Sequence, residues 1–105
     1  MAQYDIHRNP DARTRGAMPY VLELQADLLS DLDTRVVAPL VVASLYKGAV
    51  PRLNPSLIVE GVAHVLLSQQ LAAIPKRVLT GPPVINVADK SYEITAAVDF
   101  LVTGI

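Results

Sequence analysis

The sequence contains no cysteine and no tryptophan, and it has only one phenylalanine and four tyrosines among 105 residues. Without thiols the chain forms no disulfide, offers no thiolate metal ligand and carries no cysteine nucleophile. The lack of cysteine is typical of a reducing compartment, so we expect a cytoplasmic protein. Because aromatic side chains are scarce, the core has to be built mainly from valine, leucine, isoleucine and alanine.

Long apolar runs are also missing. No run approaches the roughly 20 residues that a membrane-spanning helix needs, and the first residues lack the basic-then-apolar layout of a secretion signal. We therefore expect a soluble protein with no membrane partner. The length is that of one domain, which we expect to occupy residues 1–105.

The chain has no excess of positive charge. Nine basic and ten acidic residues leave a net charge of −1. Binding to a phosphate backbone depends on lysine and arginine, so we expect no direct binding of nucleic acid. Acidic residues gather locally at Glu23, Asp27, Asp31 and Asp33, which form either a solvated loop face or a surface for a basic partner.

The usual motifs of enzymes and metal sites are absent. The two histidines are far apart, the five glycines are scattered, and no serine lies in a nucleophile-elbow context. His7 lies on the polar face of an alternating segment beside Asp5, where we expect an exposed histidine or, alternatively, a general base. His64 lies between Val62 and Leu66 at strand spacing, which indicates a packed core or interface residue. We expect no enzyme, no metal and no cofactor.

Alternation of apolar and polar residues predicts most of the strands. Residues 3–8 and 20–25 form an antiparallel pair joined by a polar loop. An irregular or 3₁₀ connection over 27–34 leads to a strand at 36–38, and 41–46 continues in extended form. Pro39 cannot donate to a ladder, so it predicts a sheet edge or a bulge.

The second half of the chain contains the strongest strand pattern. Residues 57–67 predict a hairpin that turns at Glu60-Gly61. Its second strand is apolar on both faces, which favours cover on both sides. Prolines and Gly81 bracket a further short strand at 77–79.

The last segment has the spacing of an amphipathic helix rather than a strand. Over residues 88–102 one apolar stripe is formed by Ile94, Ala97, Val98 and Leu101. Asn86 is the candidate N-cap and Gly104 the candidate C-cap. A small antiparallel sheet followed by one C-terminal helix predicts an α+β domain.

The residues after this stripe are also apolar. Phe100, Val102 and Ile105 cannot all follow Leu101 onto a single buried stripe. Either the end of the helix docks into the core, or the surplus forms a protein–protein surface, as a self-association seam or a partner site. We favour the surface.

Four stretches, spread over almost the whole chain, are similar to one known family. Residues 24–29 (LQADLL) are similar to V-Q-S-D-I-I, 35–40 (RVVAPL) to R-R-M-V-I-P-L, 71–75 (LAAIP) to M-A-S-V-P, and 103–105 (TGI) to W-G-I. Their order and spacing resemble the CcdB family, the toxins of the ccd toxin–antitoxin module. Agreement is weakest over 42–54 and 80–90, and the loop at 9–19 is a few residues longer.

The resemblance implies a fold, a target and partners. The fold would be a small twisted sheet related to SH3-like barrels, of the CcdB/MazF type. The protein would be a homodimer that binds the DNA gyrase A subunit and traps the cleaved gyrase–DNA complex. A CcdA-like antitoxin would neutralise it, and the pair would repress transcription of its own operon.

The resemblance also implies gyrase-contacting residues. Carried over by position, these are Thr103, Gly104 and Ile105, with Asp99, Leu28 and Leu29 as further candidates. The family has tryptophan where this chain has Thr103 and His64. Tryptophan offers a flat face for stacking on an arginine, which threonine lacks.

Two alternatives remain open at this stage. One is an endoribonuclease of the related fold, which would need an acid–base pair such as Arg13 or Arg15 with Asp27 or His7. The other is a chromosomal relative that no longer acts on gyrase but still binds an antitoxin. The departure at Thr103 motivates this second alternative.

Overall fold

The computed structural model describes residues 2–105. Its regular elements are the strands β1 (Asp5–Arg8), β2 (Tyr20–Glu23), β3 (Thr34–Val42), β4 (Ser56–Val59), β5 (Val62–Leu66), β6 (Ala72–Pro75) and β7 (Ile85–Asn86), and the helix α1 (Ser91–Thr103). Short 3₁₀ turns occur at Asp27–Leu29, Ala43–Leu45, Ser68–Gln70, Lys76–Val78 and Ala88–Lys90. None of the helices in the described residues is long and apolar enough to cross a membrane.

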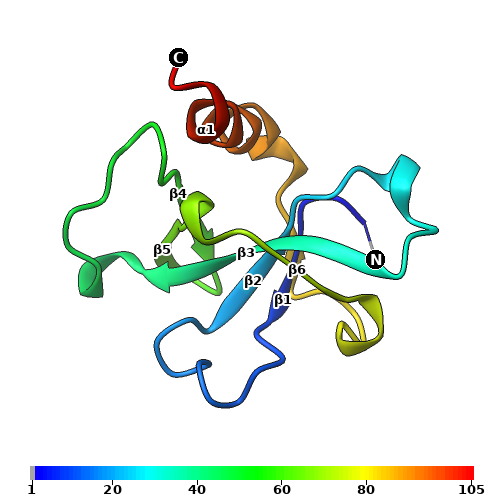
Figure 1. Ribbon diagram of the computed structural model, residues 1–105. Coiled ribbons are helices and arrows are strands. Elements are labelled where there is room, and N and C mark those ends of the chain that lie inside the picture. The colour runs from blue at the N-terminus through cyan, green and yellow to red at the C-terminus, as the bar shows by residue number, and fades with distance from the viewer. Residues whose placement is uncertain (1) are drawn as a thin grey trace.

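All of the strand pairs are antiparallel, and they form one strongly twisted sheet. The order is β4-β5-β3-β2-β1-β7, and β6 pairs with the first half of β3 beside β5. The sheet is nearly closed and barrel-like, with α1 above it (Figure 1). The predicted α+β class, with a small antiparallel sheet and one C-terminal helix, is confirmed.

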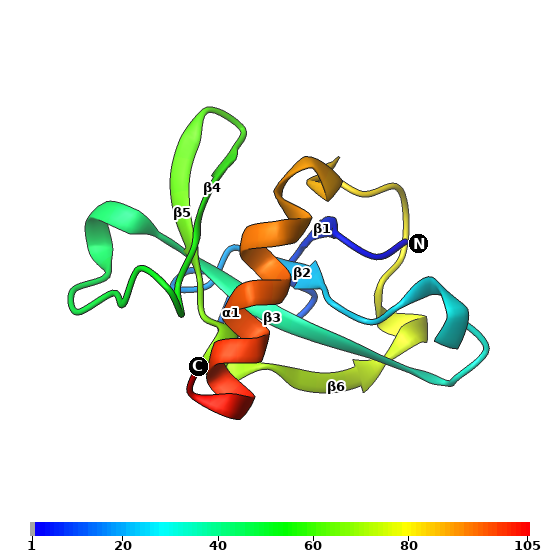
Figure 2. The same cartoon turned by 90° about the horizontal axis from the view of Figure 1, so that it is seen from above.

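The helix covers one face of this sheet. In Figure 2 α1 runs across β2 and β3. Ile94 and Ala97 of the helix are fully buried, and Ile94 belongs to a core cluster with Ile6, Leu22 and Leu40. These three strand residues come from β1, β2 and β3 and share one face of the sheet, which explains why that apolar face accepts the helix.

Pro39 occupies a central strand, so the expectation of an edge or a bulge is wrong. It lies inside β3, opposite Val21 of β2. Its carbonyl accepts the N–H of Leu67 at 2.9 Å, so its nitrogen faces the same edge of β3. That edge pairs with β6 up to Val37 and with β5 only from Leu40. The missing N–H therefore falls at the break between two neighbouring strands, where the ladder needs no donor.

The hairpin of β4 and β5 confirms the turn predicted at Glu60-Gly61. Both residues have positive φ, 51° and 79°, as a two-residue turn that matches the twist of the strands requires. The prediction that both faces of the second strand are covered by other elements is confirmed only in part. Ile58 and Val62, near the tip of the hairpin, are 60% and 47% exposed.

Two short elements differ from the sequence prediction. Residues 77–79 do not form a strand; Lys76–Val78 is a 3₁₀ turn, and the strand is β6, immediately before it. Extended structure at β6 depends on pairing with β3, which places Ala72 opposite Val37 and Pro75 opposite Thr34. For the same reason β3 extends well beyond the predicted residues 36–38, but it ends at Val42 instead of continuing to 46.

The helix begins three residues later than expected. The side-chain oxygen of Asn86 accepts the N–H of Ala88 at 2.9 Å, but α1 itself begins at Ser91 after Lys90, so the prediction of Asn86 as the N-cap of the helix is wrong. Gly104 is confirmed as the C-terminal cap. Its φ of 72° is left-handed, and its N–H donates to the Phe100 carbonyl at 2.8 Å.

Candidate functional site

The residues that the resemblance singles out at the end of α1 form a compact local structure. The Thr103 hydroxyl donates to the Asp99 carbonyl at 2.7 Å and accepts the Ile105 N–H at 3.3 Å. Together with the left-handed Gly104, these bonds close the helix and turn the chain back. We call residues 103–105 the tail. The structure brings Asp99 and the tail together.

The side chains around the tail are apolar and face outward. Val102 and Ile105 are 76% and 85% exposed, and Phe100 is half-buried. Leu101, which the apolar stripe predicts to be buried, is itself 36% exposed. A cluster of exposed apolar side chains at one end of a helix is typical of a surface that another protein covers.

The other two candidates lie elsewhere. Leu28 and Leu29 belong to the 3₁₀ turn at Asp27–Leu29, and they are 94% and 49% exposed. In Figures 1 and 2 this turn lies well away from the end of α1. Within one chain the structure therefore does not join Leu28 and Leu29 to the tail.

A cleft opens beside the tail, between α1 and the loop before β4. Its lining includes Arg52 and Ser56 on the loop side, Glu93 and Asp99 on the helix, and Ile105. Asp99 also lines a second, smaller cleft together with Tyr4 and Val98. Asp99 is thus exposed at the junction of two hollows.

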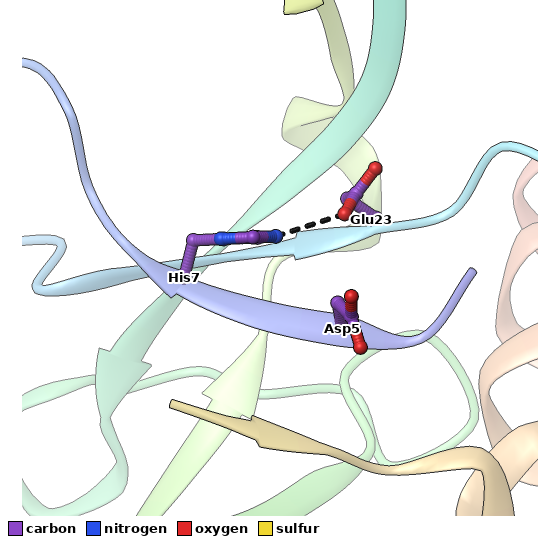
Figure 3. A group of neighbouring side chains, drawn as sticks. All are labelled: Asp5, His7 and Glu23. Atoms are coloured by element: carbon purple, nitrogen blue, oxygen red, sulfur yellow. Dashed lines mark hydrogen bonds and ion pairs between the residues drawn. The ribbon is translucent and has the colours of Figure 1, made fainter. Parts of the chain in front are cut away.

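The chemically richest cluster is buried on the other face of the sheet. Asp5, His7 and Glu23 converge from β1 and β2 (Figure 3), with His7 Nε2 2.8 Å from Glu23 Oε2. Arg35 of β3 lies behind them, with its Nε 3.7 Å from Glu23 Oε1. All four side chains are less than a tenth exposed.

This burial overturns two sequence expectations. His7 is 4% exposed rather than a surface histidine, and Glu23 is 2% exposed rather than part of an acidic loop face. The polar face of β1 and β2 is covered because the segment after β6 folds over it, with Leu79 packed against Val21 and Val37. Alternation correctly separated the two faces of the strands, but it does not tell which face meets solvent.

The cluster has the donor set of a metal site, because ligand atoms of Asp5, His7 and Glu23 lie within 4.8 Å of one another. The carboxylates, however, already have partners. Asp5 accepts hydrogen bonds from the Ala2 N–H and the Asn86 amide, both at 2.8 Å. The guanidinium beside Glu23 would also repel a cation. The arrangement fits a structural polar network better than a metal centre.

The residues named for the endoribonuclease alternative are engaged separately. Arg13 pairs with Asp11 at 3.2 Å, which holds the pKa of the Asp11 carboxyl below its usual value. Arg15 donates to the Asn9 carbonyl at 2.7 Å. His7 and Arg15 do line one cleft, but His7 Nε2 already faces Glu23. No acid–base pair of the kind that this alternative requires is assembled among residues 2–105.

His64 has the structural place predicted for it. It is 3% exposed and meets the Tyr20 ring edge-on, with ring centroids 5.2 Å apart. The Tyr20 hydroxyl donates to Glu60 at the hairpin tip, and Arg8 pairs with the same carboxylate at 3.1 Å. The hydrogen bond from Tyr20 and the charge of Arg8 lower the pKa of Glu60, whereas the bond to Glu60 raises the pKa of Tyr20.

Comparison with protein-family models decides the family. The model described as "CcdB protein" matches residues 3–104, nearly the entire chain. The chain belongs to the CcdB family. A comparison with curated proteins gives no match. Membership of the CcdB family supports a toxin of a toxin–antitoxin system.

The match covers the whole buried polar cluster and all of the tail except Ile105. It therefore does not by itself choose between them as the functional site. The choice depends on the exposure and chemistry of each region.

Proposed function

We propose that this CcdB family protein is a toxin that binds the DNA gyrase A subunit and traps the cleaved gyrase–DNA complex, without catalysing a reaction. The observation that carries the proposal is the tail. In a chain whose family match reaches residue 104, the end of α1 exposes Val102 and Ile105 instead of burying them. Exposed apolar side chains on an ordered helix end form a binding surface that needs no catalytic group.

In this proposal Thr103, Gly104 and Ile105 contact gyrase directly. Asp99 is the polar residue beside them, one helical turn earlier and exposed. Its carboxylate is available to a basic group on the partner. The contact would thus combine an apolar centre with a charged rim, as is usual for protein interfaces.

We also propose that the active form is a homodimer. The turn Asp27–Leu29 lies away from the end of α1 in Figures 1 and 2, so Leu28 and Leu29 join the gyrase surface only if a second copy is placed beside the first. The exposed Leu101 and Val102 supply apolar area for such an interface. In a symmetric dimer each tail would then lie near the other.

The remaining partner is a CcdA-like antitoxin, and the toxin–antitoxin pair would act in the cytoplasm and regulate transcription of its own operon. Support for these points comes from the family alone. An antitoxin that neutralises the toxin must cover the tail or block access to it. We therefore expect the antitoxin and gyrase to exclude each other.

Thr103 favours one alternative outcome. The Thr103 hydroxyl already donates a hydrogen bond to the Asp99 carbonyl, and threonine has no aromatic face on which an arginine could stack. A relative that binds its antitoxin but has lost action on gyrase is therefore the second candidate.

A gyrase cleavage assay tests the proposal. Purified protein is incubated with supercoiled plasmid, ATP and gyrase from the source organism, and the products are treated with detergent and protease. We expect linear DNA with the full chain and none with a variant lacking residues 103–105. Circular dichroism should show that the shortened variant is folded.

Two results would contradict the proposal. Linear DNA formed equally well by the shortened variant would exclude the tail as the poison. No linear DNA with the folded, dimeric full chain would favour the relative that has lost action on gyrase.

A further inference from the structure

The tail touches a residue 53 positions earlier in the chain. The guanidinium carbon of Arg52 lies 4.4 Å from the centroid of the Phe100 ring. The same guanidinium donates a hydrogen bond from Nη2 to the main-chain carbonyl of Ile105. One side chain therefore contacts both the last turn of α1 and the final residue of the tail.

Arg52 is carried by a loop that is fixed to the sheet. The next side chain but one, Asn54, is 4% exposed and donates to the Leu66 carbonyl of β5 at 3.0 Å. The hydroxyl of Ser68, fully buried, donates to the Leu53 carbonyl at 2.7 Å. Because the two residues that follow Arg52 are bonded to buried groups of the fold, the backbone next to Arg52 is held in place relative to the core.

The tail has few other constraints. Thr103 and Gly104 turn the chain, but residues 101–105 are all exposed, and no buried side chain anchors them. Exposed residues beyond a helix end normally fray. In the described residues, the hydrogen bond from Arg52 to Ile105 links the tail to a distant part of the chain, and the stacking contact of Arg52 with Phe100 links the helical turn before the tail to the same loop.

The geometry points to Arg52 as a positioning residue for the tail. It covers one face of Phe100 and holds the backbone of Ile105, while the side chains of Val102 and Ile105 project outward. The identity of the partner, the gyrase A subunit, rests on the proposed function above. The role of Arg52 in ordering the tail does not depend on which partner the tail binds.

Order in the tail favours binding, because a partner that binds an ordered tail does not have to offset the entropy lost when a flexible tail becomes ordered. When only a fraction of the molecules has the binding-competent arrangement, the apparent affinity falls by that fraction. Releasing the tail frees one side chain and two backbone residues, and we expect a roughly 5- to 10-fold loss of affinity for the gyrase A subunit.

Three variants separate this role from general effects. Arg52→Ala removes both contacts, whereas Arg52→Lys keeps the charge but loses the planar stacking group, so it should rescue only in part. Arg8→Ala is the matched control. Arg8 is likewise an exposed arginine over an aromatic ring, 5.7 Å from the centroid of Tyr20, and it pairs with Glu60 rather than with the tail.

The first measurement is the heteronuclear ¹H–¹⁵N NOE of Gly104 and Ile105 in the labelled full-length protein. We expect both amides to resemble the α1 amides in the wild type and in Arg8→Ala. In Arg52→Ala they should fall to values of a frayed end, with Arg52→Lys between. Thermal midpoints should agree within about 2 °C, since the residue is exposed. Unchanged NOE values in Arg52→Ala would overturn the inference.

The second measurement is the affinity of the same variants for the gyrase A subunit. We expect the 5- to 10-fold loss with Arg52→Ala, partial recovery with Arg52→Lys and no loss with Arg8→Ala. A released tail that still binds at full affinity would also overturn the positioning role. Failure of the wild type to bind gyrase would refute the proposed function, and the NOE values would then decide the role of Arg52 in ordering the tail.

Discussion

The tail and the buried polar cluster contrast in every respect that bears on function. Asp5, His7, Glu23 and Arg35 have the chemistry expected of an active site, yet they are buried and bonded to one another or to neighbouring backbone. The tail contains no titratable side chain, yet its apolar groups are in solvent. The residue types with reactive groups are thus buried in the fold, while the exposed apolar surface that we propose as the binding site consists of Ile105 in the tail and Val102 beside it.

The difference follows from which groups each region buries and which it exposes to solvent. Burying charged groups is unfavourable unless they are paired, so the cluster must be complete for the sheet to pack. Exposing apolar groups is unfavourable unless a partner covers them, so we expect the tail to be covered in a complex. Changes in the cluster should therefore affect stability, and changes in the tail should affect binding.

The largest expected effect is on stability, from Glu23→Ala. The substitution leaves Arg35 and His7 without their buried partner. We expect the free energy of unfolding to fall by about 3–5 kcal/mol, as when one member of a buried pair is removed. Urea unfolding followed by circular dichroism measures it. Asp31→Ala removes an exposed acidic residue nearby and should change the value by less than about 0.5 kcal/mol. Equal effects of the two variants would show that the cluster is not a structural network.

The next effect is on binding, from Thr103→Trp. An aromatic face at this position adds stacking worth roughly 1–2 kcal/mol when a partner arginine covers it, or about a 10-fold gain in gyrase affinity. Thr95→Trp is the matched control, because Thr95 is exposed on the same helix and bonds back to the Ser91 carbonyl at 2.8 Å. Isothermal titration measures both. A gain at Thr95 as large as that at Thr103 would indicate nonspecific apolar binding.

The smallest effect is a pH dependence at the hairpin tip, from Glu60→Gln. The bond from Tyr20 lowers the pKa of Glu60 from 4.5, so the ionised form stabilises the folded state. That contribution is present above the unfolded pKa and is lost as pH falls through the lower folded value. The wild type should therefore lose more stability than Glu60→Gln between pH 6 and about pH 3.

Urea midpoints at the two pH values test this prediction, with Glu93→Gln on the exposed face of α1 as the control. The control should lose as much stability on acidification as the wild type. An identical acid loss in the wild type and in Glu60→Gln would show that the hairpin pair contributes nothing. Binding to gyrase at neutral pH should be unchanged in Glu60→Gln.

Elements with a strong local pattern could be predicted from the sequence. The alternation at 3–8 and 20–25 located β1 and β2, and the stripe that includes Ile94 and Ala97 located α1. The short strands β6 and β7 have too few residues to show a period. They exist because β3 and β1 offer edges to pair with, which is information from elsewhere in the chain.

The candidate site was predictable only in part, for the same reason. The surplus of apolar residues after Leu101 indicated an exposed surface, and the resemblance named Thr103 to Ile105. The burial of His7 depends on the segment containing Leu79, and the contact of Arg52 with the tail joins distant residues. Neither leaves a local pattern in the sequence.

Gyrase binding by two variants, compared side by side, tests the central claim most directly. One lacks residues 103–105, and the other is Glu23→Gln, which keeps the side-chain shape but removes the charge from the buried cluster. We predict that the shortened protein is nearly as stable as the wild type but does not bind the gyrase A subunit. Glu23→Gln should be less stable yet bind like the wild type wherever it is folded. Binding that survives loss of the tail, or that disappears in folded Glu23→Gln, would contradict the account.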